Sequence, residues 1–168
     1  MSTKDGFAVS RTIVILLCVL ITMQVGYVIT QHRSHASMCE ENLNRIYLAM
    51  ELYEIERGTL PRLSFFPNDP RNDPDSLCVV LAEYGASRDI PICPAAHEIH
   101  RNMGLTYLWN MKLNGAKLDN EGEPRWMLVE INALSDKVPE PHFGRYNILY
   151  TDGRILRSSE PPAGLRPN

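Results

Sequence analysis

The feature that most constrains the fold of this chain is an apolar stretch without a single charged residue, from Ile13 to Ile29. It is about 17 residues long, which is at the short end of what crosses a bilayer as one helix. Thr22 and Gln24 are its only clearly polar members, and membrane helices tolerate the glycine at Gly26. The pattern predicts one transmembrane helix at about residues 12–30.

Two other interpretations of the stretch remain open. A cleaved secretory signal has an apolar core of about 7–15 residues followed by a site with small residues. Ser34-His35-Ala36 is such a site, with a mature start at Ser37, but the apolar run is long for this class. A lipoprotein signal needs a small residue before the cysteine, whereas Met38 precedes Cys39. A retained anchor is therefore favoured.

Charges around the stretch indicate its orientation. Lys4 and Arg11 precede it, and only Arg33 follows closely. Cytoplasmic flanks are enriched in Lys and Arg, so this small bias favours a short cytoplasmic tail with most of the chain outside. The whole chain has 20 Asp and Glu against 17 Lys and Arg, a net charge of −3. It therefore lacks the surplus of cations that a strongly basic nucleic-acid binder uses, and no nucleic-acid partner is expected.

Beyond the apolar stretch, the helical pattern continues. Leu43, Ile46, Tyr47 and Met50 follow the spacing of one apolar helix face. Gly58 is a typical residue just after a helix end, and a proline at position 61 prevents continuation. We expect one helix from about residue 8 to 57, roughly 75 Å long. Its Met/Tyr/Leu face is expected to pack on the core of a head domain.

The remainder predicts a short helix and then strands. Asp73 is the expected N-cap of a helix over 75–84 that closes at Gly85. Strands are expected at residues 106–113, 126–131, 146–150 and 154–157. The last two are joined at Asp152-Gly153, a hairpin signal in which the glycine takes a positive φ. The proline-rich tail after residue 158 is expected to be loose.

Three of the four cysteines lie outside the apolar stretch, namely Cys39, Cys78 and Cys93. An oxidising compartment would permit one disulfide among them and leave one thiol. The sequence does not choose the pair. Cys78–Cys93 is favoured, because it closes a short loop.

Metal sites are weakly indicated. Cys93, His97 and His100 form a C-x3-H-x2-H pattern of zinc or copper ligands, but a structural site needs a fourth ligand. Acidic loops could supply oxygen ligands to calcium, although neither matches a calcium-loop pattern. Their acidic and amide residues are Asp69, Asp73 and Asp75 in one loop and Asp119, Asn120, Glu121 and Glu123 in the other. Solvated turns are the default interpretation, and no cofactor is expected.

No pattern predicts catalysis. The sequence contains no G-x-S-x-G, H-E-x-x-H, C-x-x-C or phosphate-binding G-x-x-x-x-G-K-[ST] motif. His142 and Asp152 are a candidate His–Asp pair, but no motif places a serine or cysteine beside them. The chain is expected not to be an enzyme.

Several weak motifs occur in one order. His142 is followed by nine residues and then Asp152-Gly153. Upstream are a C-x-x-N-L-x-x-I pattern beginning at Cys39, a G-x-L-P pattern at residues 58–61, Cys93-Pro94, and a T-Y-x-x-N pattern at residues 106–110. This order resembles the prepilin-like, type II secretion-like pseudopilins that carry an H-x9-DG signature.

The resemblance implies an α+β, pilin-like fold in which a long N-terminal transmembrane helix packs on a small antiparallel β-sheet head. It divides the chain into a leader-like cytoplasmic tail at residues 1–6, the helix at 7–57 and an extracytoplasmic head at 58–168. It also implies cleavage between Gly6 and Phe7 by a prepilin peptidase, with methylation of the new amine. The fifth mature residue would be Arg11, where the family has a glutamate that pairs with a neighbour's N-terminal amine; arginine would repel that amine.

The expected function is a structural subunit of a type II secretion-like or pilus-like assembly, held in the bacterial inner membrane with its head in the periplasm or outside. Its partners would be other pseudopilin-like subunits, contacted through the N-terminal helix, and membrane lipid. Arg11 keeps open a second hypothesis, a membrane-anchored binding module of the same fold that does not polymerise. A third is a membrane-tethered metal-dependent enzyme built on Cys93, His97 and His100 or on His142 and Asp152.

Overall fold

The computed structural model describes residues 4–86, 90–118, 122–135, 137–138, 141–142 and 144–165, with side chains of the first helix from Thr12 onward. Its longest element is α1, Lys4–Arg57, which confirms the single long helix expected from the sequence. Contacts divide the chain into two compact units, residues 1–34 and 35–168, so the second unit includes the C-terminal half of α1.

The first unit presents apolar side chains to its surroundings. From Ile13 to Ile29 the large apolar residues are all exposed, in a helix long and apolar enough to cross a membrane. Within this helix the hydroxyl groups of Thr22 and Thr30 donate hydrogen bonds to the carbonyl oxygens of Val19 and Gly26, both at 2.9 Å. Such bonds satisfy the polar hydroxyls without any partner from outside the helix.

The second unit is built on a four-stranded antiparallel sheet with the strand order β1-β2-β3-β4. The strands are β1 Tyr107–Trp109, β2 Trp126–Glu130, β3 Tyr146–Tyr150 and β4 Ile155–Ser158. Neighbours in sequence pair in space, with Leu108 opposite Val129 and Leu128 opposite Leu149. The long helix and this small sheet make the chain α+β.

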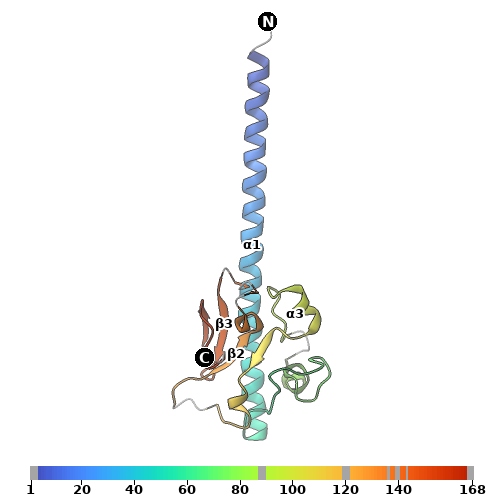
Figure 1. Ribbon diagram of the computed structural model, residues 1–168, viewed down its shortest axis with the longest axis vertical. Coiled ribbons are helices and arrows are strands. Elements are labelled where there is room, and N and C mark those ends of the chain that lie inside the picture. The colour runs from blue at the N-terminus through green and yellow to red at the C-terminus, as the bar shows by residue number, and fades with distance from the viewer. Residues whose placement is uncertain are drawn as a thin grey trace. The chain divides into compact units, whose positions relative to one another are not determined.

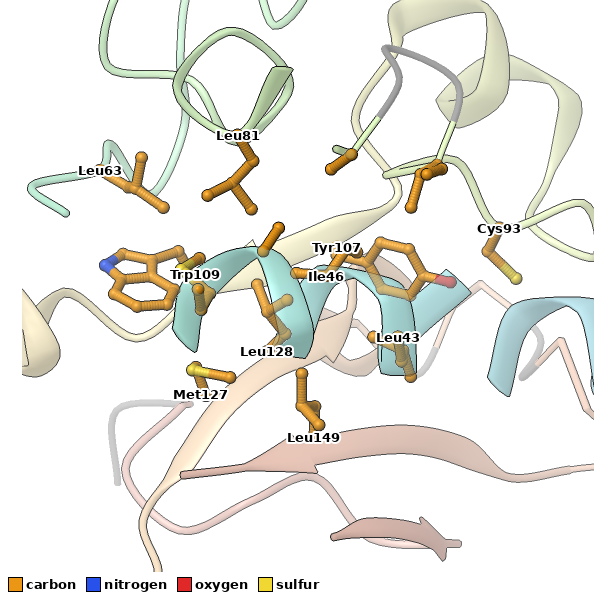
Figure 2. Packing of buried hydrophobic residues seen from close by; sticks show 14 of the residues in the cluster. Leu43, Ile46, Leu63, Leu81, Cys93, Tyr107, Trp109, Met127, Leu128 and Leu149 are labelled. Carbon is orange, nitrogen blue, oxygen red and sulfur yellow. The ribbon is translucent and has the colours of Figure 1, made fainter. Parts of the chain in front are cut away.

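The C-terminal half of α1 lies beside β2 and β3 (Figure 1). Its buried residues Leu43, Ile46 and Met50 are each 0% exposed, which confirms that this face packs on the core. Figure 2 shows Met127 and Leu149 below the helix and Leu81 on its other side. The C-terminal half of α1 is therefore enclosed between the sheet and the segment of chain that follows α1. Burying this apolar face, rather than helix propensity, holds the helix to the head.

The opposite face of the sheet carries a second apolar cluster. It includes Leu108, Val129, Tyr146 and Ile148. Leu165 packs against this cluster, and the indole Nε1 of Trp126 donates to the carbonyl oxygen of Ala163 at 3.2 Å. The prediction of a loose tail is therefore wrong as far as Leu165.

Three local predictions differ from the structure. The strand expected at 106–113 ends at Trp109, because the Asn110 side chain accepts from the N–H of Lys112 and begins the 3₁₀ helix η2, Met111–Leu113. The helix expected at 75–84 is two short pieces, α2 Leu77–Val80 and η1 Ala82–Tyr84. Its N-cap is Ser76, whose hydroxyl accepts from the N–H of Val79 at 3.3 Å, whereas the carboxylate of Asp73 accepts from the N–H of Asp69.

One helix was not expected, α3, Glu98–Met103. Gly104 ends it in the left-handed conformation, with φ 78°. A glycine at this place is a common helix stop, so the sequence carried a signal for the end of α3.

The β3–β4 hairpin confirms the turn predicted at Asp152-Gly153. The carbonyl oxygen of Tyr150 accepts from the N–H of Gly153 at 3.0 Å, and the N–H of Tyr150 donates to the carbonyl oxygen of Arg154 at 2.9 Å. Gly153 has φ 80°, which is typical of hairpins whose loop ends in a left-handed residue. A β-carbon there would lie 3.0 Å from Cε1 of the Tyr47 ring on α1.

Candidate functional site: a buried cluster of two cysteines, a glutamate and a histidine

Four side chains from four parts of the second unit, which we call the head from here on, meet in its interior. Cys39 comes from α1, Cys93 from the segment before α3, Glu130 from the end of β2 and His142 from the segment before β3. One potential ligand atom from each lies within 4.8 Å of all the others. Both cysteines are 0% exposed, Glu130 is 1% and His142 is 4%.

The two cysteines form a disulfide between residues 54 apart in sequence, with their Cα atoms 5.0 Å apart. The favoured Cys78–Cys93 pair is therefore wrong. Cys78 is a buried thiol whose Sγ lies 4.0 Å from the carbonyl oxygen of Gly104. Loop length favoured the nearer cysteine, but the fold decides the pair, because it brings α1 and the segment at Cys93 together.

The histidine and the glutamate form a second pair beside the disulfide. His142 Nε2 lies 2.6 Å from Glu130 Oε1. Each of these atoms lies 3.5 Å from Cys93 Sγ. His142 Nδ1 has no hydrogen-bond partner among the described residues. Nε2 is therefore the nitrogen through which the imidazole interacts with the cluster.

Asn147 donates two further hydrogen bonds to the buried carboxylate of Glu130. Its backbone N–H donates to Glu130 Oε2 at 3.0 Å, and its side-chain Nδ2 donates to Glu130 Oε1 at 3.2 Å. A carboxylate buried without donors would cost several kcal/mol, so these bonds make the burial tolerable. Asn147 and Glu130 come from adjacent strands, and this end of the sheet is therefore polar on the side that faces α1.

Thr106, just before β1, and Tyr107, its first residue, hold the backbone around the cysteines. The Thr106 hydroxyl accepts from the N–H of Cys93 at 2.8 Å and donates to the carbonyl of Pro91 at 2.9 Å. The Tyr107 hydroxyl donates to the carbonyl of Cys39 at 3.4 Å. Burial, and then the negative charge of Glu130, raise the pKa of Tyr107 well above its usual 10.0. The phenol therefore stays protonated, and able to donate a hydrogen bond, to a more alkaline pH than an ordinary tyrosine.

The cluster has the chemistry of a closed metal site or a structural disulfide, and its burial disfavours thiol exchange with a substrate. A thiolate must reach a disulfide sulfur to attack it, and both sulfurs here are inside the core. The donor set of two sulfurs, one imidazole and one carboxylate is one that zinc binds when the sulfurs are thiolates.

The structure does not bring the predicted ligands Cys93, His97 and His100 together as a site. Cys93 is in the disulfide, and His97 caps α3 by accepting the N–H of Ile99 on Nδ1 at 3.4 Å. The two histidine rings are 6.2 Å apart at their centroids, and partial burial lowers the pKa of His100. Among the described residues, the metal-capable group is the buried one around Glu130.

In the candidate calcium loop at Asp69, the Asp69 carboxylate accepts hydrogen bonds from residues of the same loop. The Asp69 carboxylate accepts from the Arg71 N–H at 3.1 Å and from the Asn72 amide at 2.7 Å, and these bonds lower its pKa, the Asn72 bond most. Asp75 is exposed, and its backbone carbonyl accepts from the N–H of Ser64. In the second loop, Asp119, Asn120 and Glu121 lie outside the described residues, and Glu123 is exposed.

The three signature residues have separate roles. His142 finds its carboxylate in Glu130, whereas Asp152 lies in the hairpin and accepts from the Arg154 N–H at 3.1 Å. The candidate His142–Asp152 pair is therefore wrong. Gly153 packs against Tyr47, whose hydroxyl donates to the carbonyl of Thr151 at 3.4 Å. Thr151 and Gly153 thus hold the hairpin against α1, Asp152 interacts within the hairpin, and His142 belongs to the buried cluster.

Sequence reasoning missed Glu130. It is the only charged residue in the strand Trp126-Met127-Leu128-Val129-Glu130. Strand alternation places it on the same face as Leu128, which is fully buried. A lone carboxylate on the core face of an apolar strand was the signal that could have identified it.

A scan of protein-family models and searches of curated proteins and of solved structures find no match for this chain. The resemblance to pseudopilins therefore stays a prediction made from the order of motifs, and the processing residues Gly6 and Phe7 stay a prediction with it. Fold and site define the chain as an α+β protein with a long apolar N-terminal helix and a buried Cys–Cys–Glu–His cluster.

Proposed function

We propose that this chain is a membrane-anchored structural subunit of a pseudopilin-like assembly in the bacterial inner membrane, with a pilin-like head outside the cytoplasm. The observation that carries the proposal is the exposed, charge-free face of α1 from Ile13 to Ile29. An apolar helix surface of this size is stable only in lipid or against other apolar helices. Both environments belong to a subunit that is held in a membrane and then packs into a fibre.

The head half of α1 supplies a second argument for subunit packing. Leu48, Leu52 and Ile55 lie on the side of α1 away from the core, with 57%, 51% and 80% of their surface exposed. Their spacing of four and three residues makes one continuous apolar stripe. Such a stripe is a suitable contact for a neighbouring helix of the same kind.

Membrane anchoring is tested by placing charge inside the apolar stretch. Leu17→Arg combined with Leu20→Arg should release the full chain from carbonate-washed membranes, because each arginine near a bilayer centre costs about 2.5–3.5 kcal/mol. Leu48→Arg is the matched control, an exposed leucine of the same helix in the head, and should stay in the membrane fraction. Equal retention of both variants would contradict the anchor.

Assembly is tested by the mass of the mature N-terminus in the native host. A chain that begins at a methylated Phe7 supports the pseudopilin subunit. An intact Met1 on a membrane-retained chain contradicts it and supports the second candidate, a binding module of the same fold that does not polymerise. The residue that favours this second candidate is Arg11, which replaces the expected glutamate at the fifth mature position. A start at Ser37 would identify a cleaved signal and contradict both.

A further inference from the structure

The disulfide does not explain the polar groups beside it. A buried disulfide is apolar and needs neither a carboxylate nor an imidazole as a neighbour. Burying Glu130 and His142 costs desolvation free energy that a pair of apolar residues in the same place would avoid. Yet Glu130 Oε1 and His142 Nε2 both lie 3.5 Å from Cys93 Sγ, on one side of the sulfur pair.

The two distances from Cys93 Sγ to Glu130 Oε1 and His142 Nε2 match those around a tetrahedral zinc ion. With zinc–sulfur, zinc–nitrogen and zinc–oxygen bonds of about 2.3, 2.05 and 2.1 Å, a tetrahedral site has sulfur–nitrogen and sulfur–oxygen edges of about 3.5 Å. The corresponding distances from Cys93 Sγ are 3.5 and 3.5 Å. The nitrogen–oxygen edge, now a hydrogen bond of 2.6 Å, would need to open to about 3.4 Å. Opening this edge, and separating the two sulfurs to the distance found around zinc, each means a displacement of less than about 2 Å.

We propose that Cys39, Cys93, Glu130 and His142 form a zinc site when the disulfide is reduced. A dithiol that reaches the sulfurs when the surrounding structure opens locally supplies the two electrons and two protons that convert the disulfide into two thiols, and is itself oxidised to a disulfide. Zn²⁺ then displaces both thiol protons to solvent and binds the two thiolates. His142 Nε2 gives up its hydrogen bond to Glu130 and binds through its lone pair, with the proton on Nδ1.

Asn147 is positioned to support the metal form. Its backbone N–H holds Glu130 Oε2, so the carboxylate stays oriented with Oε1 towards the sulfurs. A carboxylate fixed in this way is a one-oxygen ligand, and outer hydrogen bonds of this kind orient metal ligands in general. The closed, four-protein-ligand set with no open position is typical of structural rather than catalytic zinc.

The charges favour zinc over harder cations. Two thiolates and one imidazole are soft or borderline donors, which magnesium and calcium do not prefer. Two thiolates and one carboxylate carry three negative charges, of which a divalent cation neutralises two.

The test uses the full chain purified in detergent. One sample is kept oxidised, and another is treated with dithiothreitol until thiol counting finds all four cysteines reduced. The dithiothreitol is then removed by anaerobic gel filtration. Both are titrated with Zn²⁺, and separately with Co²⁺, whose thiolate charge-transfer band reports sulfur ligation without any mutation. We expect one zinc per reduced chain, a cobalt–thiolate band in the reduced chain, and neither in the oxidised chain.

Variants separate this site from adventitious metal binding. Cys39→Ser should abolish stoichiometric zinc, and His142→Ala should weaken zinc affinity by at least about tenfold. Cys78→Ser and His97→Ala, which remove a thiol and an imidazole outside the cluster, should bind as the unaltered chain does. A reduced unaltered chain that shows no cobalt–thiolate band overturns the proposal, as does zinc binding that Cys78→Ser removes and His142→Ala does not.

Discussion

The contact between Gly153 and Tyr47 makes the hairpin turn a quantitative test of how the sheet is fastened to α1. Replacing Gly153 with alanine adds a β-carbon at φ 80°, a conformation that L-residues adopt at a cost of about 1–2 kcal/mol. The loss of chain entropy in the unfolded state returns about 0.4–1 kcal/mol of this. Backbone strain alone therefore predicts a net loss of about 1 kcal/mol.

The Tyr47 ring adds a second cost. The new β-carbon would lie 3.0 Å from Cε1 and 3.1 Å from Cζ of that ring, closer than the ordinary carbon–carbon contact. Crowding of this kind in a packed site typically costs about 1–3 kcal/mol. Gly153→Ala should thus lower the free energy of unfolding by about 2–4 kcal/mol in total.

Gly85→Ala is the matched control. Gly85 has φ 85°, but a β-carbon there meets nothing within 4 Å. It should therefore lose only the strain contribution, about 1 kcal/mol. Urea unfolding of the full chain in detergent, followed by the fluorescence of Trp109 and Trp126, gives both values.

Equal losses for Gly153→Ala and Gly85→Ala would refute the argument from the Tyr47 contact. A further check places Gly153→Ala in a Tyr47→Ala background, where the ring is gone. The excess loss at Gly153 should then disappear, leaving a coupling free energy of about 1–3 kcal/mol between the two positions.

Three further predictions concern the buried cluster. Peptide mapping without reduction should recover Cys39 linked to Cys93, and a Cys78–Cys93 peptide would refute the assignment. Cys39→Ser should destabilise the oxidised chain by about 4 kcal/mol, the value expected for a loop closed over 54 residues. Glu130→Ala should cost about 3–5 kcal/mol, since it leaves His142 and Asn147 without their buried acceptor, whereas the exposed Glu123→Ala should change stability by less than about 0.5 kcal/mol. Because burial raises the pKa of Tyr107 above 10.0, the unfolded chain releases that proton first, and Tyr107 should lower the free energy of unfolding by up to about 1.4 kcal/mol per pH unit above about pH 10. Tyr107→Phe should reduce the alkaline slope by this amount, measured by urea unfolding at several alkaline pH values.

Elements with strong periodicity were predictable from the sequence. The helix expected at about 8–57 is α1, Lys4–Arg57, and the strand expected at 146–150 is β3. Both have long apolar patterns and clear end signals, Gly58 for the helix and the Asp152-Gly153 turn for the strand. The strand over 106–113 failed because one side-chain bond from Asn110 turns the backbone into η2, and such local competition is invisible to periodicity.

The candidate site was less predictable, because its members come together only through the fold. His142 was identified by the signature it begins, but its partner Glu130 lies on another strand. Cys39 and Cys93 were both named as candidates, but the argument from loop closure favoured the wrong pair, since it ignores what α1 packs against. Pairings across 54 residues of sequence are decided by the packing of the core.

The disulfide between Cys39 and Cys93 also sets how the head responds to mechanical load. Tension applied along α1 from its N-terminal side reaches Cys39 near the start of the second unit, which begins at residue 35. From there a covalent path leads directly to Cys93 and bypasses residues 40–92. The helix cannot be peeled out of the head beyond Cys39 without breaking a covalent bond, so the apolar contacts of Leu43, Ile46 and Met50 are shielded from a pulling force.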